Sequence, residues 1–387
     1  MVKAIKAMLI PNNVQKTKMF QYAGASRFAY NWALAREIEN YEKGGKFISD
    51  AELRKEFTKL RHSDEYAWLL SISNNVTKQA IKDACTAYKN FFKGLQKFPR
   101  FKSKKRSMPK FYQDNVKIRF SNTHVKFEGF SSSRKANKQK MNWVRLAEHG
   151  RIPTDVKYMN PRISFDGLNW WISVCVEFPD CRETLNDDGV GIDLGIKDLA
   201  ICSDGTKYKN INKSQKVKKL EKQKRRLQRS ISRSYEKNKK GESYCKTNNV
   251  IKKEKLLLKR NHRLTNIRKN YLNQTISEII NRKPRFICIE DLNVSGMMKN
   301  RHLSKAVQEQ GFFWFRKQLE YRCSDKGIQL IVADRFYPSS KLCSCCGNIK
   351  KDLKLSDREY RCECGNIIDR DFQASINLKG YGERFAS

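Results

Sequence analysis

The spacing of hydrophobic positions changes along the first half of the chain. The opening segment KAIKAMLI has an extended apolar pattern that ends at Pro11, and it predicts a strand without a partner nearby. Between Lys16 and Phe98 apolar and aromatic residues recur at helical spacing, which predicts about three helices. Alternation from Val116 to Phe178, broken by Gly, Asn and Asp-Gly signals, predicts an antiparallel barrel or sheet that the first strand joins.

The second half follows a polar segment, RETLNDD, which predicts a linker. From Gly189 onward, VGIDLGIKDLAICSDG predicts a hairpin, and PRFICIEDL and IQLIVAD predict buried strands. A helix is expected between those two strands, from Gln310 to Lys326. Residues 213–269 carry 22 Lys and Arg against four Glu, with apolar residues interleaved, and predict one or two long basic helices. Most single charges in this block are expected on a solvated helix face.

The charge balance indicates a polyanionic partner. The 387 residues include 80 Lys and Arg against 40 Asp and Glu, and a formal net charge of +40 repels itself unless a polyanion covers it. Nucleic acid is the first partner to expect. No apolar run approaches the roughly 18 residues that span a bilayer, and the N-terminus has no signal-peptide pattern. We therefore expect a soluble, intracellular protein with no membrane partner.

Five of the 12 cysteines crowd together, from Cys343 to Cys364. Fifteen residues separate the pair Cys343 and Cys346 from the pair Cys362 and Cys364, which is close to the spacing of four-thiolate zinc sites. We predict one structural zinc ion on these four residues and a spectator role for Cys345, although the second pair is spaced C-x-C instead of C-x-x-C. The remaining seven cysteines are expected to be buried thiols: Cys85, Cys175, Cys181, Cys202, Cys245, Cys288 and Cys323.

Three carboxylates stand at strand or helix ends. Asp193 lies within VGIDLG, Glu290 ends FICIE, and Asp371 begins DFQASINL. Cleavage of a phosphodiester by the two-metal route needs carboxylates that converge from separate elements to hold two ions roughly 4 Å apart. Each residue alone also has a structural explanation: Asp371 as a helix cap, Glu290 as a polar strand end, and Asp193 as a turn former.

The carboxylate and cysteine motifs together resemble a known family. GIDLGIKDLAICSDG, IEDLNVSGMMKN and the cysteine ribbon followed by DRDFQASIN are similar to the three RuvC motifs of the TnpB (OrfB) proteins of bacterial insertion sequences, which are relatives of compact type V CRISPR nucleases. RFAYNWAL, FPRFKSKK, the basic helices and KLCSCCG fall in the family's order. The resemblance covers nearly the whole chain and is most specific from Gly189 to Lys379. The short Cys362-x-Cys364 knuckle departs from the family pattern.

The resemblance implies a multidomain α+β fold. An N-terminal β-barrel of residues 1–11 and 99–185 would carry an inserted helical recognition bundle of residues 12–98. An RNase H-like (RuvC) α/β domain of residues 186–337 and 366–387 would follow, with a zinc ribbon inserted at residues 338–365.

The resemblance also implies a function, an RNA-guided DNA endonuclease encoded by a transposon. Asp193, Glu290 and Asp371 would bind two catalytic magnesium ions, and the enzyme would cut double-stranded target DNA next to a short adjacent motif. The partners would be a guide RNA and the target DNA, with one protein chain on each RNA, in the bacterial cytoplasm. A large basic excess is expected for such partners, because they are bound mainly through backbone phosphates.

Other functions remain open at the level of the sequence. A catalytically inert, RNA-guided DNA-binding repressor on the same scaffold would be indicated by the loss of an acid, and all three acids are present. A transposase in the strict strand-transfer sense would need a tyrosine or histidine-pair nucleophile site, which the motifs do not supply. A plain zinc-ribbon protein that binds nucleic acid would leave Asp193 and Glu290 unexplained. The neighbouring DNA, not the chain, distinguishes a transposon protein from a CRISPR effector.

Overall fold

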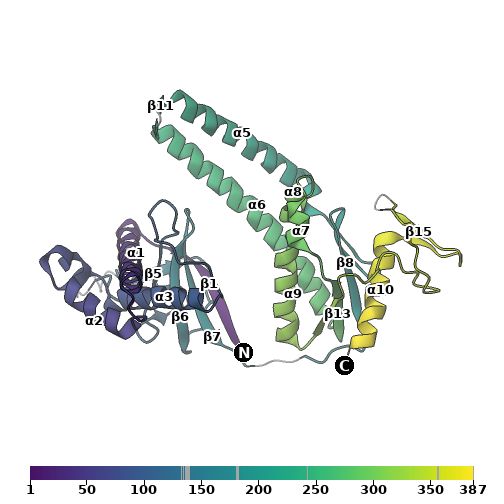
Figure 1. The fold of residues 1–387 in the computed structure, drawn as a ribbon, viewed down its shortest axis with the longest axis horizontal. Coiled ribbons are helices and arrows are strands. Elements are labelled where there is room, and N and C mark those ends of the chain that lie inside the picture. Colours follow the sequence, from purple (N-terminus) through teal and green to yellow (C-terminus); the bar gives the residue numbers. More distant parts are fainter. Residues whose placement is uncertain are drawn as a thin grey trace. The chain divides into compact units, whose positions relative to one another are not determined.

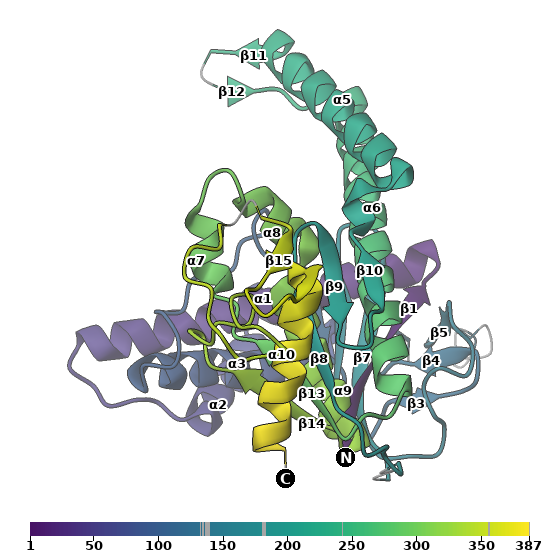
Figure 2. The same cartoon turned by 90° about the vertical axis from the view of Figure 1, so that its right-hand side faces the viewer.

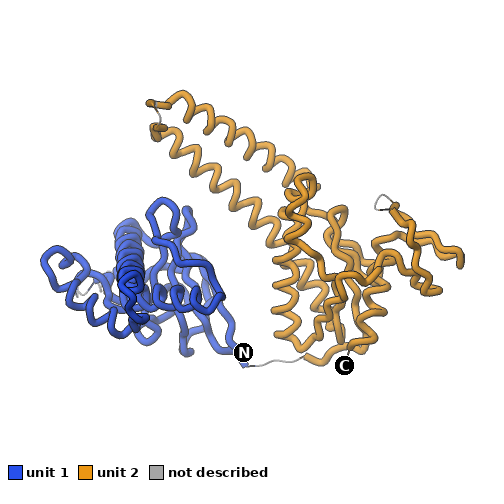
Figure 3. Tube along the Cα trace, in the orientation of Figure 1, with its two compact units in different colours: residues 1–179 blue, residues 180–387 orange. Residues whose placement is uncertain are grey.

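The chain divides into two compact units, Met1–Pro179 and Asp180–Ser387 (Figure 3). The computed structural model describes every residue except 132, 134, 136–139, 180–182, 242, 355, 356 and 387. Cys181, one of the expected buried thiols, and the start of the expected linker lie outside the described residues. The division follows Pro179, close to the start of that polar segment.

The first unit contains one antiparallel sheet with strand order β2-β6-β7-β1-β5-β4-β3. The first strand joins it as predicted, because Ile5 pairs with Val174 of β7 and Leu9 with Leu146 of β5. The expected closed barrel stays a prediction, since the pairing order of the described strands is open. The strands are β1 (Val2–Ile10), β2 (Lys110–Tyr112), β3 (Arg119–Phe120), β4 (His124–Lys126), β5 (Trp143–Leu146), β6 (Tyr158–Phe165) and β7 (Trp170–Glu177).

Helices α1 (Asn13–Glu42), α2 (Asp50–Arg61) and α3 (Asn74–Phe92) and the 3-10 helix η1 (Asp64–Ser71) follow β1. Asn12 and Ser49 begin α1 and α2 with capping boxes. Tyr22 of α1, Phe57 of α2 and Ile172 of β7 belong to one buried cluster. Helices and sheet therefore share a hydrophobic core, and the expected boundaries between a barrel and a bundle remain predictions.

The second unit is built on a mixed sheet with strand order β10-β9-β8-β13-β14. Strands β8, β9 and β10 are antiparallel, as the predicted hairpin requires, whereas β13 runs parallel to both β8 and β14. A mixed α/β arrangement was expected for this half. The strands are β8 (Val190–Leu194), β9 (Asp198–Cys202), β10 (Lys207–Lys209), β13 (Phe286–Glu290) and β14 (Gln329–Ala333).

Helices cover both faces of this sheet. Ile276 of α6 and Phe315 of α9 pack with Ile192 and Ile289 on one face, whereas Leu378 of α10 packs with β13 and β14 on the other. Figure 2 shows α10 lying across the strands. The elements are the 3-10 helix η2 (Ile211–Lys213) and helices α5 (Gln215–Lys237), α6 (Asn248–Asn281), α7 (Val294–Lys299), α8 (Ser304–Gln310), α9 (Phe312–Lys326) and α10 (Arg370–Phe385).

The predicted basic block forms two long helices. In Figure 1, α5 and α6 run side by side as an arm that extends away from the mixed sheet. The short strands β11 (Lys239–Lys240) and β12 (Ser243–Tyr244) lie between them in the chain. No helix among the described residues is both long and apolar enough to cross a membrane.

The expectation for the scattered cysteines is correct in part. Cys85, Cys202, Cys288 and Cys323 are buried, and Cys175 is half-buried. Cys245 is exposed, so the prediction is wrong for this residue. It lies in the short loop between β12 and α6, at the tip of the arm.

Candidate active site and metal centre

Asp193 lies on β8, on the face of the sheet that α10 covers. A side chain at position 191 would lie on the same face, because side chains along a strand alternate with a period of two. A Cβ atom at Gly191 would stand 2.1 Å from the carbonyl oxygen of Ser375 and 2.3 Å from the amide nitrogen of Lys379. Glycine at this position therefore lets the α10 backbone lie directly against β8, with the first turn of α10 toward Asp193.

Glu290 ends β13, the strand next to β8. The pairing of Ile289 with Ile192 puts Glu290 beside Asp193 at the next position of the parallel ladder. The hydroxyl of Ser339, which is buried, donates a hydrogen bond to Oε1 of Glu290. Two residues that are distant in the sequence are thus brought together by strand pairing, and a third fixes one of their carboxylates.

Asp291 follows Glu290 but is already paired. Its carboxylate accepts a hydrogen bond from Nη1 of Arg316 at 2.6 Å and a second from Nη2 of Arg335. These two guanidinium groups lower the pKa of Asp291. Asp291 therefore acts as a structural anion that holds two arginines at the end of β13.

Asp369 and Asp371 differ in their contacts at the start of α10. Asp369 is the N-cap residue, and its Oδ1 accepts a hydrogen bond from the amide of Phe372 at 3.0 Å. This hydrogen bond holds the turn at the start of α10. Asp371 lies in the first helical turn, and its carboxylate has no hydrogen bond or ion pair within the described residues. The capping explanation therefore belongs to Asp369 and leaves the role of Asp371 open.

The three carboxylates destabilise one another. Burial raises the pKa of Asp193 well above its usual range, and the charges of Glu290 and Asp371 raise it further, against the opposing charge of Arg370. Burial also raises the pKa of Glu290. The hydrogen bond from Ser339 and the charge of Arg370 lower this pKa, whereas the charge of Asp371 raises it. A cation between these groups would relieve the repulsion.

The three carboxylates do not surround one point. Within the described part of the chain, the residues whose ligand atoms all lie within 4.8 Å of one another are the cysteines 343, 346, 362 and 364. The carboxylate oxygens of the three acids are not all this close to one another, so the acids are spread more widely than the ligands of one small ion.

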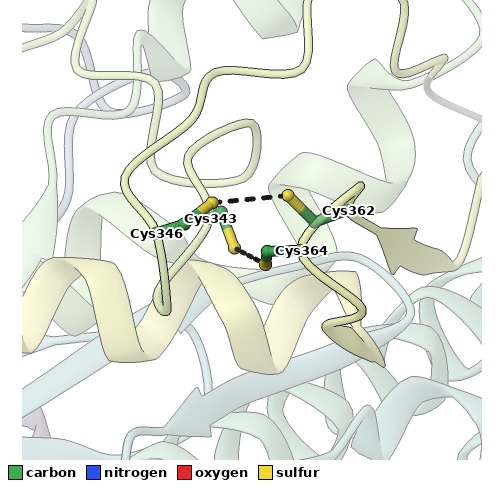
Figure 4. Close-up of side chains that lie close together, drawn as sticks. All are labelled: Cys343, Cys346, Cys362 and Cys364. Atoms are coloured by element: carbon green, nitrogen blue, oxygen red, sulfur yellow. Dashed lines mark hydrogen bonds between the residues drawn. The ribbon is translucent and has the colours of Figure 1, made fainter.

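The ribbon brings the four expected cysteines together. The sulfur of Cys343 lies 3.7 Å from that of Cys364, and the sulfur of Cys346 lies 3.5 Å from that of Cys362 (Figure 4). Four sulfurs at ~2.3 Å from a tetrahedral zinc ion would be ~3.8 Å apart, close to these distances. Cys345 is exposed and outside the cluster. The short C-x-C knuckle is therefore compatible with a metal site.

Positive φ angles shape both knuckles. Gly347 (φ 75°) and Gly365 (φ 87°) follow the second cysteine of each pair, in the backbone region that glycine adopts at least cost. Backbone amides also face the sulfurs. Burial alone would raise the pKa of Cys343, but hydrogen bonds from the backbone of Cys346 and Cys345 outweigh it and lower this pKa to about 6. The site thus favours a thiolate, the form that binds metal.

Helix α10 connects the ribbon to the carboxylates. The ribbon strands β15 (Glu359–Arg361) and β16 (Ile367–Asp369) pair with each other, and β16 leads directly into α10. The buried Gln373 donates to the carbonyl oxygen of Leu342 at 2.7 Å, and Asn377 donates to those of Ser339 and Leu342, both at 2.7 Å. The same helix therefore positions Asp371, the serine that binds Glu290 and the first knuckle.

The sequence analysis missed two residues of this site. Ser339 contacts Glu290, and Arg370 lowers the pKa of both Asp193 and Glu290. Arg370 stands inside the motif DRDFQASIN, so its position next to Asp371 was a usable signal. Ser339 lies in a polar loop, and nothing in its local pattern points to β13.

Family models match three parts of the chain. A "Probable transposase" model, OrfB of IS605, matches residues 173–301, and a "Cas12f1-like, TNB domain" model matches residues 312–378. A "Helix-turn-helix domain" model of the same OrfB group matches residues 1–46, which form β1 and α1 here.

Named relatives match almost end to end. The chain is 30% identical to "Putative RNA-guided DNA endonuclease InsQ" of Escherichia coli over 381 residues, which cover 94% of this chain and 87% of that protein. It is 28% identical to a "Putative RNA-guided DNA endonuclease" of Streptomyces pristinaespiralis, with 98% of this chain and 89% of that protein covered.

Solved structures share the fold at low sequence identity. A Cas12f1 chain, from a complex with single-guide RNA and target DNA, matches with a TM-score of 0.60 and 11% identity over 98% of each chain. A chain of the mini-RNA-guided endonuclease Cas_phi3 matches with a TM-score of 0.53 and 10% identity, with 98% of this chain and 92% of that chain covered. At these identities the likeness shows the fold alone.

Proposed function

The chain belongs to the TnpB (OrfB) family of insertion-sequence transposon proteins, and from this premise we propose that it is an RNA-guided DNA endonuclease. The observation that carries the proposal is the meeting of Asp193, Glu290 and Asp371. They come from a strand, its parallel neighbour and the first turn of the helix that covers both strands.

The chemistry of these residues suits magnesium. Oxygen ligands are the ones that Mg²⁺ prefers, and the buried Asp193 and Glu290, whose pKa values are raised, would be stabilised as carboxylates by a divalent cation. Two ions about 4 Å apart, each held by part of the set, would use all three carboxylates. When bound, such ions supply an activated water and stabilise the leaving oxygen of a phosphodiester.

The protein's own residues would set the geometry of the reaction. Asp193 and Glu290 are held by adjacent strands, so their separation is fixed by the sheet. Ser339 orients Glu290 through its hydrogen bond, and Arg370 offsets part of the negative charge. Asp371 is placed by a helix whose cap, Asp369, is a separate residue.

The ribbon would hold one structural zinc ion on Cys343, Cys346, Cys362 and Cys364. The support is the thiol chemistry and the near-tetrahedral sulfur spacing of the cluster. Four protein ligands leave no open coordination position, so this ion would stabilise the start of α10 and take no part in the reaction.

A guide RNA would cover much of the excess positive charge. The exposed arginines 225, 226, 229 and 233 lie along α5, on the arm that extends from the catalytic unit. Contacts to phosphates make such binding strong at low salt and weak at high salt. A double-stranded DNA target would be recognised mainly through pairing with the guide.

A catalytically inert repressor is the alternative function on the same scaffold. The presence of all three acids on one face of the sheet favours the nuclease. A strict strand-transfer transposase with a tyrosine or histidine-pair nucleophile finds less support, because the residues proposed here as catalytic are the acids Asp193, Glu290 and Asp371.

One experiment tests the proposal. The protein is purified with its RNA, the RNA is sequenced, and a double-stranded DNA that matches the guide segment is offered with magnesium. Cleavage that requires both the match and magnesium is expected. Binding of the matched DNA without any cleavage would establish the repressor instead.

A further inference from the structure

A cavity opens beside Glu290, at the ends of β8 and β13. Its volume is about 250 Å³, and it is lined by Leu194, Ile289, Glu290, Phe312, Phe313 and Arg335, among others. The lining thus includes Glu290, a proposed catalytic residue at the end of β13, and the rest of it is mainly apolar. The cavity is smaller than the ~300 Å³ at which typical ligand pockets begin, so it suits a single ring system.

Phe313 gives the cavity an exposed aromatic wall. This residue lies in the first turn of α9 and is 63% exposed, an unusual degree for a phenylalanine. The ammonium group of Lys317 lies 6.0 Å from the ring centroid. An exposed aromatic ring beside a cation is the arrangement on which proteins stack the bases of single-stranded nucleic acid.

Two arginines line the cavity, and one of them, Arg335, has N–H groups left to donate to a ligand. Arg316 is shared between Asp291, at 2.6 Å, and Glu320, at 3.1 Å. Within the described part of the chain Arg335 pairs with Asp291 alone, and its side chain is 50% exposed. Because a guanidinium has five N–H donors, Arg335 can also bind a phosphate while Asp291 holds it in place.

Asn293 and Ser295 give the cavity a fixed polar edge. Oδ1 of Asn293 accepts hydrogen bonds from Oγ of Ser295 at 3.0 Å and from the amide of Gly296 at 2.9 Å. These bonds leave the amide NH₂ group of Asn293 as the part that can donate to an acceptor on a base edge. Asn293 and Ser295 both line the cavity.

We infer that this cavity binds one unstacked nucleobase of the DNA strand being cut, next to the scissile phosphate. The inference rests on the proposed function and extends it, because it assigns a base-binding subsite to the carboxylate site. Phe313 stacks on the base, and Arg335 binds the adjacent phosphate. The subsite thereby places the phosphodiester at Glu290 and requires a single-stranded substrate there.

The first test does not depend on cleavage. The Asp193→Ala protein with its RNA is bound to target DNA that carries 5-iododeoxyuridine at one position at a time around the cut, and the complex is irradiated. We expect one position to crosslink to Phe313, identified by peptide mass spectrometry. Crosslinking to other residues only, or to none, would overturn the subsite even if the protein is a nuclease.

The second test uses cleavage and a matched control. An abasic nucleotide at the crosslinked position, or Phe313→Ala with the intact strand, should each lower kcat/KM about 5-fold to 150-fold, the equivalent of ~1–3 kcal/mol for one stacked base. The two changes together should cost no more than one, because they remove the same contact. Phe313→Trp should restore most activity.

Tyr321 is the control, since it is 44% exposed on the same helix and is not among the residues that line the cavity. Tyr321→Ala should leave cleavage of the intact strand unchanged and keep the full effect of the abasic nucleotide. If the losses in kcat/KM from Phe313→Ala and from the abasic nucleotide multiply when the two changes are combined, the stacking of Phe313 on that base is contradicted. If wild type cuts no DNA at all while the crosslink forms, the proposed function fails, and base binding at Phe313 stands without its assignment to a cleavage site.

Discussion

A carboxylate buried beside two others reduces the stability of a fold until a cation joins it. Asp193 is in that position, because burial and the charges of Glu290 and Asp371 all raise its pKa. A residue that was only structural would gain a hydrogen bond or a salt bridge, as Asp291 does with Arg316. This contrast between Asp193 and Asp291 supports the proposal that Asp193 is a metal ligand and Asp291 a structural residue.

This contrast predicts that Asp193→Asn stabilises the metal-free protein. Because the pKa of Asp193 is raised in the folded protein, wild type loses stability as the pH rises from the pKa of the unfolded chain, about 4, through the pKa of the folded protein. Below pH 4 residue 193 is neutral in both proteins, so they should be equally stable. In EDTA at pH 8, the variant should melt a few degrees higher, at about 2–4 °C per kcal/mol. The difference should vanish near pH 4.

The control for this prediction is Asp352→Asn, at an exposed position of the ribbon. Its melting temperature should follow that of wild type at both pH values. A metal-free Asp193→Asn protein that is less stable than wild type at pH 8 would mean that the carboxylate makes a favourable contact in the fold.

Individual elements were predictable where apolar residues follow a regular pattern, along one side of a helix or through a short buried strand. The hairpin from Gly189, the strands β13 and β14 and the helices of the basic arm were all expected, because their periodicity is set by local burial. Strand β2 was missed, since Lys110–Tyr112 lies in a basic, Pro-punctuated segment and is defined by its pairing with β6. Elements of three residues depend on a partner that local pattern does not reveal.

The ribbon and α10 act together as one element. We expect about one zinc ion per chain and loss of that ion in Cys346→Ser, because a tetrahedral site does not tolerate a missing thiolate. The start of α10 should then loosen, since Ser344 next to the knuckle donates a hydrogen bond to Gln373 at 2.9 Å. Metal analysis and the rate of target cleavage measure the two effects.

Cys345→Ser is the matched control, as Cys345 is adjacent and equally exposed but outside the cluster. It should keep both zinc and cleavage. Zinc lost from Cys345→Ser and retained in Cys346→Ser would exchange the roles of these two residues.

Across the whole molecule, the net charge of +40 predicts a polyanionic partner. The sequence indicates the kind of partner through its total charge, but where the charge gathers depends on the fold. Many of the basic residues lie on the arm of α5 and α6. One of them, Arg268, is paired with Glu221 at 3.1 Å.

Replacing the arginines 225, 226, 229 and 233 with glutamine should weaken RNA binding and make it less sensitive to salt. Each lost phosphate contact lowers the slope of log affinity against log salt by about 0.7–0.9, so four contacts amount to about 3. Binding titrations at several salt concentrations give the slope. A slope that is unchanged by the four substitutions would remove the arm from the RNA contact.

At the scale of the whole site, sequence and structure contribute different parts. The motifs identify the three acids and four cysteines, because each sits in a short pattern with a chemical meaning. The partners of those residues were not predictable: Ser339 reaches Glu290 only because Gln373 and Asn377 bind the loop that carries it. Long-range hydrogen bonds of this kind leave no periodic signal.

The comparison of Asp371→Ala with Asp369→Ala tests the central claim most directly. The two residues are two positions apart, and one is proposed to bind magnesium while the other caps α10. Cleavage of matched double-stranded DNA is measured with magnesium and the co-purified RNA, and target binding is measured in parallel. Asp371→Ala should bind the target and lose more than ~100-fold in cleavage, beyond what indirect changes at metal sites cost. Asp369→Ala should lose ~1 kcal/mol of stability and keep most of its cleavage. Wild-type cleavage by Asp371→Ala, with Asp369→Ala inactive, would contradict the account.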